Sequence, residues 1–252
     1  CKNWRIKMFD TYVMHCERLT ERRDHIEKTL RNMDIYNYHL ITNEMDNDWC
    51  SYGGFYEDNK LKAREYAQVW LDQHPDETYN HNKLSAASIS LCWKWYNALK
   101  RFVDSSESDY GLFLEDDCCF DKSVNKKDID LIIKLAAILL NPTRSVGDVI
   151  FLGGAFGHSI LNFTKTLHFD VDSLFDVLLI ADHPSTNTTS SLIIEKSVAK
   201  RILDVLCPFY LPVDWQFNHI FKELDLSVVH TYPYMCSQLS AKKDGFISEV
   251  KR

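Results

Sequence analysis

Three consecutive acids follow one apolar stretch of the chain. Residues 110–120 read YGLFLEDDCCF, so the apolar run ends in Glu115, Asp116 and Asp117. Alternate residues of a strand share a face, and two residues advance the chain by about 6.6 Å. Glu115 and Asp117 are therefore expected to point together, at a separation that a hydrated divalent cation can bridge. The pattern predicts a site for Mn²⁺ or Mg²⁺, whose remaining coordination positions are typically filled by phosphate oxygens.

Like charges at the end of an apolar strand need a physical reason. Two carboxylates about 6 Å apart repel by roughly 3 kcal/mol at an effective dielectric constant near 20. A cation between them turns this repulsion into attraction, so we favour a metal-held diphosphate as the interpretation. The alternative is a solvated strand end that merely tolerates acids. Asp116 faces the opposite side of the strand, where it is expected either to hydrogen-bond a ligand or to cap the following turn.

The rest of the chain alternates between strand and helix patterns. The first helix is expected to begin near Thr20, a residue type that caps helices. The expected strands are residues 11–16, 36–42, 148–154 and 226–231, together with the run before the acids. The expected helices are residues 20–33, 62–73, 84–103, 126–140 and 213–224, and residues 190–206 are expected to turn from a strand into a helix. Residues 171–180 are ambiguous, and residues 46–56 form a polar, aromatic loop.

This alternation predicts an α/β fold with one mixed but mainly parallel sheet flanked by helices. Ligands of such sheets gather at the carboxyl ends of the strands, where the three acids are expected to lie. The 252 residues are 45% hydrophobic, which is enough for the core of one large domain spanning residues 1–252.

Charge and cysteine content narrow the class of protein. The formal net charge of -7 argues against a general role in binding nucleic acid or an anionic membrane. The eight cysteines form no C-x-x-C pair, which favours reduced thiols in the cytoplasm. No apolar stretch approaches the roughly 20 residues of a membrane span, and the charged start is not a signal peptide. We therefore expect a soluble, cytoplasmic protein without a transmembrane segment.

Several segments, taken in order, resemble glycosyltransferase family 25, which includes lipooligosaccharide and collagen galactosyltransferases and related viral enzymes. The matching segments are YVMHCERLTERRDHIEKTL, YGLFLEDDCCF, DVIFLGG, TTSSLIIEKSVAKRIL and LPVDWQFN. The resemblance implies a GT-A fold, an acidic motif that binds a divalent metal, and inverting transfer of a sugar from a nucleotide donor to an acceptor hydroxyl. A UDP-sugar of galactose, glucose or xylose and a glycan or glycoprotein acceptor are the expected partners. Residues 84–99 depart from the family's Gly-Glu-x-Gly-Cys and Ser-His signature, which leaves donor and acceptor identity open.

The resemblance gives roles to residues around the metal and the acceptor. Glu115 and Asp117 are the expected metal ligands, and His230, at the end of a late strand, is the expected further ligand; a packed or solvated histidine is the alternative. Asp214 is the expected base that removes the acceptor's proton, because its partly apolar setting would raise its pKa. Its alternative is an ordinary helix cap. Trp215 is expected to stack on an acceptor sugar.

A second group of residues is expected to contact the nucleotide sugar. Its members are Arg18, Thr42, Asn43, Asp116, Thr188, Thr189, Lys242 and Lys243. Arg18 is preferred to Arg22 and Arg23 because adjacent residues of a helix point apart, and a guanidinium near the first strand could hold a phosphate. The alternatives are a solvated helix face for the arginines, plain turns for the threonines and Asn43, and an exposed tail for the lysines.

Two other classes of protein remain open. A metal-dependent phosphoester hydrolase or nucleotidyltransferase would use the same acids, although the sequence offers no second acidic or His-rich motif for it. An inactive carbohydrate-binding homologue is the other class, which the intact acidic triplet argues against.

Overall fold

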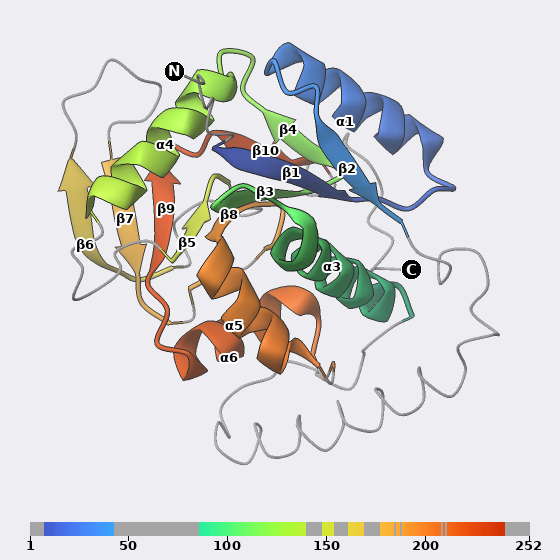
Figure 1. Cartoon of the computed structure of the whole chain (residues 1–252). Coiled ribbons are helices and arrows are strands. Elements are labelled where there is room, and N and C mark those ends of the chain that lie inside the picture. The colour runs from blue at the N-terminus through green and yellow to red at the C-terminus, as the bar shows by residue number, and fades with distance from the viewer. Residues whose placement is uncertain are drawn as a thin grey trace, which may run out of the picture.

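A computed structural model describes residues 8–42, 86–139, 148–153, 161–168, 177–183, 185–186, 188–207, 209 and 211–239. The helices are α1 (Thr20–Asn32), α3 (Ala86–Ser105), α4 (Lys126–Leu139), α5 (Lys196–Leu206) and α6 (Val213–Glu223). The strands are β1 (Phe9–Met14), β2 (Tyr38–Ile41), β3 (Tyr110–Glu115), β4 (Cys118–Phe120), β5 (Val149–Phe151), β6 (Phe163–His168), β7 (Val177–Ala181), β8 (Ser191–Glu195), β9 (Val228–Tyr232) and β10 (Cys236–Gln238). Figure 1 shows them in place.

Most of the expected elements are confirmed, including the helix that begins at Thr20 and the strand that ends at Glu115. The ambiguous segment contains β7, and the short strands β4, β6 and β10 were not predicted. The expected helix at residues 62–73 and the expected loop at residues 46–56 lie outside the described residues.

Eight of the strands form one mixed sheet in the order β2-β1-β3-β8-β5-β9-β7-β6. The pairs β1/β2, β1/β3 and β5/β9 are parallel, whereas β3/β8, β5/β8, β6/β7 and β7/β9 are antiparallel. The prediction of a mixed sheet is therefore confirmed, but the prediction that it is mainly parallel is wrong. The reason is that β7 and β8 run against the other strands inside the sheet, and each reversed strand makes two antiparallel pairs.

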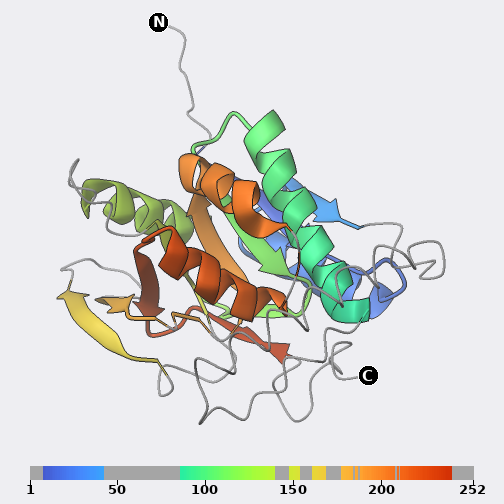
Figure 2. The same cartoon turned by 90° about the horizontal axis from the view of Figure 1, so that it is seen from below.

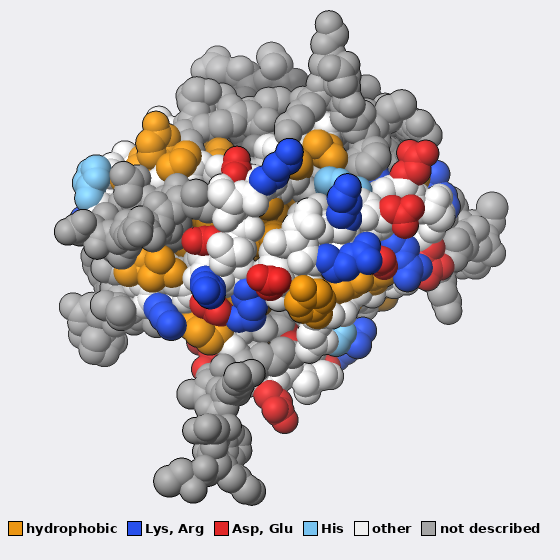
Figure 3. Space-filling view, turned by 90° about the horizontal axis from the view of Figure 1, so that it is seen from above, with side chains coloured by type: hydrophobic (Ala, Val, Ile, Leu, Met, Phe, Trp, Pro, Cys, Tyr) orange, Lys and Arg blue, Asp and Glu red, His pale blue; other side chains and the backbone are white. Residues whose placement is uncertain are grey.

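Helices cover both faces of this sheet. Side chains of β1 alternate between the faces: Tyr12 and Met14 join the core under α3, α5 and α6, whereas Phe9 and Val13 join the core under α1 and α4. Figure 2 shows α3, α5 and α6 side by side across the first face. On the second face, seen from above, basic and acidic side chains of the described residues are interspersed (Figure 3). This arrangement of layers confirms the α/β class and the flanking helices.

The six strands other than β7 and β8 run in one direction, so their carboxyl ends share an edge of the sheet. The acidic turn, residues 115–117, lies at this edge and leads into β4, which pairs with β10 in a second, two-stranded sheet. Gly153 bridges to Cys236 so closely that a Cβ atom there would collide with the Cys236 backbone. The late chain is thereby brought against the acidic turn.

None of the described helices combines the length and the apolarity that a membrane crossing requires.

Candidate functional site

The carboxylate of Glu115, the last residue of β3, is held by side chains from two distant segments. Its Oε1 accepts a hydrogen bond from the Thr189 hydroxyl at 2.5 Å, and its Oε2 accepts one from Gln238 Nε2 at 3.0 Å. The Thr188 hydroxyl donates in turn to Gln238 Oε1 at 3.3 Å. Thr188 and Thr189, expected to contact the nucleotide sugar, instead orient Glu115 and its partner in this structure.

The environment of Glu115 disfavours its negative charge. Burial and the neighbouring charge of Asp117 raise the pKa of Glu115 to about 8, and Asp214 and Asp116 add to this effect although the Thr189 hydrogen bond opposes it. Glu115 and Asp117 therefore act on one another electrostatically, as strand geometry predicts. The charge of Asp214, a residue far from Glu115 in the sequence, also raises the Glu115 pKa.

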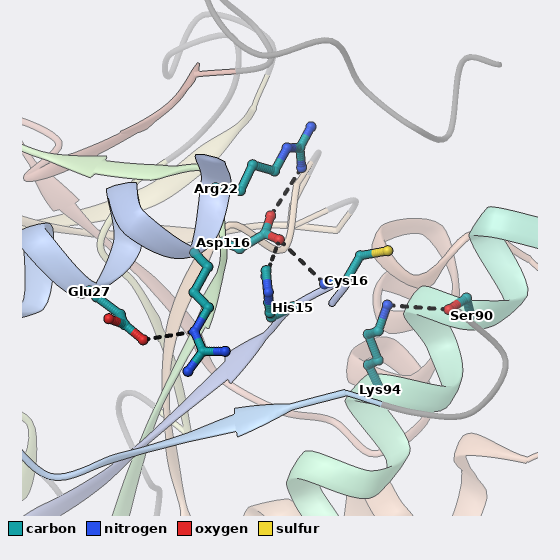
Figure 4. Close-up of polar contacts among 8 residues, drawn as sticks. His15, Cys16, Arg22, Glu27, Ser90, Lys94 and Asp116 are labelled. Atoms are coloured by element: carbon teal, nitrogen blue, oxygen red, sulfur yellow. Dashed lines mark hydrogen bonds and ion pairs between the residues drawn. The ribbon is translucent and has the colours of Figure 1, made fainter. Parts of the chain in front are cut away.

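Asp116 is turned away from this group, as predicted, but its partners are different from those expected. Its Oδ2 accepts hydrogen bonds from His15 Nδ1 at 2.9 Å and from the Cys16 backbone at 3.5 Å, and its Oδ1 accepts one from Arg22 Nη1 at 3.0 Å (Figure 4). Burial would raise the pKa of Asp116, but the His15 hydrogen bond and the Arg22 charge outweigh it, and the pKa lies below its usual value. Both carboxylate oxygens are thus engaged within the protein, which favours a structural role for Asp116 over the expected contact with the donor.

The arginine that meets the acidic turn is Arg22 rather than Arg18. Arg18 is exposed in the turn after β1, and Arg23 pairs with Glu27 at 3.0 Å on the surface of α1. Arg22 and Arg23 have separate partners, Asp116 and Glu27, as expected for adjacent helical side chains that point apart. Arg18 was preferred because of its position in the sequence. The sequence does not show that Arg22 hydrogen-bonds Asp116, which lies 94 positions away.

Asp214 lies in the first turn of α6, where Pro212 is the cap residue and no side chain caps the helix. The interpretation of Asp214 as an ordinary N-cap is therefore wrong. Burial raises the pKa of Asp214 to about 6, and hydrogen bonds from backbone amides, including Trp215 N–H at 3.0 Å, oppose the rise. The charge of Asp214 also acts on the Cys92 thiol of α3. A general base needs a pKa nearer to neutral pH than that of an ordinary aspartate, and Asp214 meets this requirement.

His230 is packed into the protein rather than presented to a metal. It is 1% exposed, and its ring stacks on Phe151 with centroids 4.8 Å apart. Its Nε2 donates to the Ser185 carbonyl at 2.8 Å, and its Nδ1 lies 3.1 Å from the Tyr234 hydroxyl. Because both ring nitrogens have partners in the protein, this geometry favours the packed interpretation over the metal-ligand role.

The remaining predicted contacts lie apart from the acids or outside the described residues. The Thr42 hydroxyl donates to Glu17 at 3.1 Å on the surface. Asn43, Lys242 and Lys243 lie outside the described residues.

Three residues with structural importance for the site were not predicted. Gln238 and His15 hold two of the acids, and Asn218 of α6 fixes the segment before β8. The Asn218 Oδ1 accepts from the backbone amides of residues 185 and 186 at 2.7 and 3.0 Å, and its Nδ2 donates to the carbonyl of residue 186 at 2.7 Å. The sequence offers no local signal for Asn218, because its partners lie 32 and 33 positions away.

The acids have the chemistry of a site for a hard divalent cation. Within the described ranges, no three His, Cys, Asp or Glu side chains are grouped as ready metal ligands. Mg²⁺ and similar cations, however, typically use one or two carboxylates and complete their coordination with phosphates and water. Burial is the largest cause of the raised Glu115 pKa, and the repulsion from Asp117 that adds to it is what a bound dication would relieve. Glu115 and Asp117 therefore fit such an ion.

No model of a protein family matches the chain, and no curated protein matches it.

Proposed function

We propose that the protein is a metal-dependent inverting glycosyltransferase of GT-A type. It would transfer a sugar from a nucleotide donor, such as a UDP-sugar of galactose, glucose or xylose, to a hydroxyl of a glycan or glycoprotein. The observation that carries this proposal is Glu115 at the end of β3, whose pKa is raised by burial and by the charges of Asp117 and of the distant Asp214. The mixed sheet with helices on both faces is compatible with the GT-A fold.

In this proposal Asp214 acts as the general base. With a pKa raised to about 6 by burial, it is ionised at neutral pH and is still more basic than an ordinary aspartate. It takes the proton of the acceptor hydroxyl while that oxygen forms a bond to the anomeric carbon and the bond to the leaving diphosphate breaks. The half-buried Trp215 beside it offers an aromatic surface to the acceptor sugar.

Glu115 and Asp117 would hold Mn²⁺ or Mg²⁺, which neutralises the charge that develops on the leaving diphosphate. Thr189 and Gln238 fix the Glu115 carboxylate, so that it is oriented before a ligand arrives. We do not assign a metal-binding role to His230 or a donor contact to Asp116. The cysteine pattern favours activity in the cytoplasm.

Incubation with Mn²⁺ and each common nucleotide sugar tests the proposal through the release of nucleoside diphosphate. Release with one donor, lost in Asp214→Asn and Asp117→Asn, supports the glycosyltransferase. The matched control is Asp204→Asn, because Asp204 is an exposed acid of α5 paired with Lys200. Release of phosphate or nucleoside monophosphate would identify a hydrolase instead, and binding without turnover would identify an inactive carbohydrate-binding protein.

A further inference from the structure

The middle acid of the triplet belongs to a charged cluster of its own. Asp116 joins His15, at the exit of β1, to Arg22 in the first turn of α1; we call these three residues the clasp (Figure 4). His15 and Asp116 are 1% and 4% exposed, and the Arg22 side chain is 13% exposed. A carboxylate so deeply buried is stable as an anion only with good hydrogen-bonding partners, and here a guanidinium and an imidazole supply them.

The clasp fastens the acidic turn at its centre. Asp116 stands between Glu115 and Asp117 in the chain, so whatever fixes its carboxylate also restricts the peptides that carry its two neighbours. The register places Met14 of β1 opposite Glu115, so His15 leaves β1 beside the point where the turn leaves β3. On the other side of the turn, the Asp117 carbonyl accepts a hydrogen bond from the Leu239 amide at 3.0 Å.

The clasp also separates the charges of three consecutive acids. Arg22 and His15 contact Asp116, whereas Thr189 and Gln238 contact Glu115. The charge of Asp116 is thereby compensated by Arg22 within the protein.

We propose that His15 and Arg22 are positioning residues: through Asp116 they hold Glu115 and Asp117 in the geometry that binds a divalent cation. The part of this inference that concerns catalysis rests on the proposed function. The part that concerns the conformation of the acidic turn does not depend on that function and can be measured separately.

The test compares Arg22→Gln with Arg23→Gln in the whole chain. The two arginines are adjacent on α1, but Arg23 pairs with Glu27 on the surface and does not meet the acidic turn in this structure. We expect Arg22→Gln to weaken Mn²⁺ binding by roughly tenfold or more, as the loss of partners that orient metal ligands typically does, and Arg23→Gln to leave it within about twofold. Binding is read from the electron paramagnetic resonance signal of free Mn²⁺.

A pair of His15 variants distinguishes positioning from general packing. In His15→Asn the amide nitrogen lies near the place of Nδ1 and can donate to Asp116, whereas His15→Leu fills the space without a donor. We expect His15→Asn to retain Mn²⁺ affinity better than His15→Leu. Circular dichroism confirms that each variant is folded, and Arg22→Lys, which keeps the charge, replaces Arg22→Gln if that variant does not fold.

Hydrogen exchange at the amides of residues 115–118 decides the structural part. Faster exchange at these amides in Arg22→Gln, but not in Arg23→Gln, supports the conclusion that the clasp holds the turn. If the exchange result holds but the wild-type protein binds no Mn²⁺, the proposed function fails and the structural role of the clasp stands. Unchanged exchange and unchanged Mn²⁺ affinity in Arg22→Gln would overturn the inference.

Discussion

Replacing Glu115 with glutamine removes a charge that the folded protein disfavours, so we expect the metal-free variant to be more stable than the wild type at alkaline pH. The pKa of Glu115 rises from the ordinary 4.5 to about 8 in the folded protein. One pKa unit corresponds to about 1.4 kcal/mol, so the upper limit of the stabilisation is about 5 kcal/mol. Because Glu115 keeps some contact with solvent, which screens the charge, we expect about 2 to 3 kcal/mol in practice.

The dependence on pH has a definite sign. Below pH 4.5 Glu115 is protonated in both the folded and the unfolded chain, so the wild type and Glu115→Gln should differ little. As the pH rises from 4.5 to about 8, the unfolded chain loses this proton first, and the wild type is progressively destabilised relative to the variant. Above pH 8 the difference should be constant. Asp214 and the other acids are present in both proteins, so their contributions largely cancel.

Urea denaturation at pH 5 and pH 8.5 with a chelator measures this difference in the free energy of unfolding. Glutamine keeps the shape of the side chain, and the Gln238 amide can rotate to present its oxygen to the new amide group. Glu195→Gln, at the far end of the antiparallel neighbour β8, is the matched control and should change stability little at either pH. Adding Mn²⁺ should stabilise the wild type but not Glu115→Gln. A variant less stable than the wild type at pH 8.5 would refute the electrostatic reasoning.

Three further substitutions test other parts of the site. Asp214→Asn should lower kcat by about 10² to 10⁴, and wild-type activity should decline as the pH falls below about 6, where Asp214 becomes protonated; a pH–rate profile checks both. Asn218→Ala should destabilise the protein by about 3 kcal/mol in urea denaturation, because it leaves buried backbone groups at Ser185 and Thr186 without their partner. His230→Gln should lower the free energy of unfolding by about 1 to 3 kcal/mol and leave Mn²⁺ affinity unchanged, since His230 is packed on Phe151. Weaker Mn²⁺ binding in that variant would restore the metal-ligand role.

Local patterns predicted the parts of the fold that depend on neighbours in the sequence. The start of α1 at Thr20, the apolar run before Glu115 and the alternation that turns Asp116 away are all short-range features, although the cap residue of α1 is Leu19 and no side chain caps the helix. The raised pKa of Asp214 followed from its apolar neighbours in the same way.

What the sequence did not predict depends on contacts between distant residues. Thr189 and Gln238 reach Glu115 across 74 and 123 positions of the chain, and no local spacing records such a contact. The direction of β8 is likewise absent from its sequence, because an apolar strand has the same pattern read either way. The sequence suggested His230 as a metal ligand because it lies near a strand end. The hydrogen bond from its ring to the Ser185 carbonyl, 45 positions away, is not visible in the sequence.

The pairing of β4 with β10 has a consequence for the order of events during synthesis. Residues 118–120 emerge from the ribosome long before residues 236–238, and neither strand has its partner until both are present. Closing so large a loop is entropically unfavourable before the intervening chain has folded. A nascent chain that stops short of Gln238 therefore has its three acids but lacks the side-chain amide that holds the Glu115 carboxylate in the folded protein.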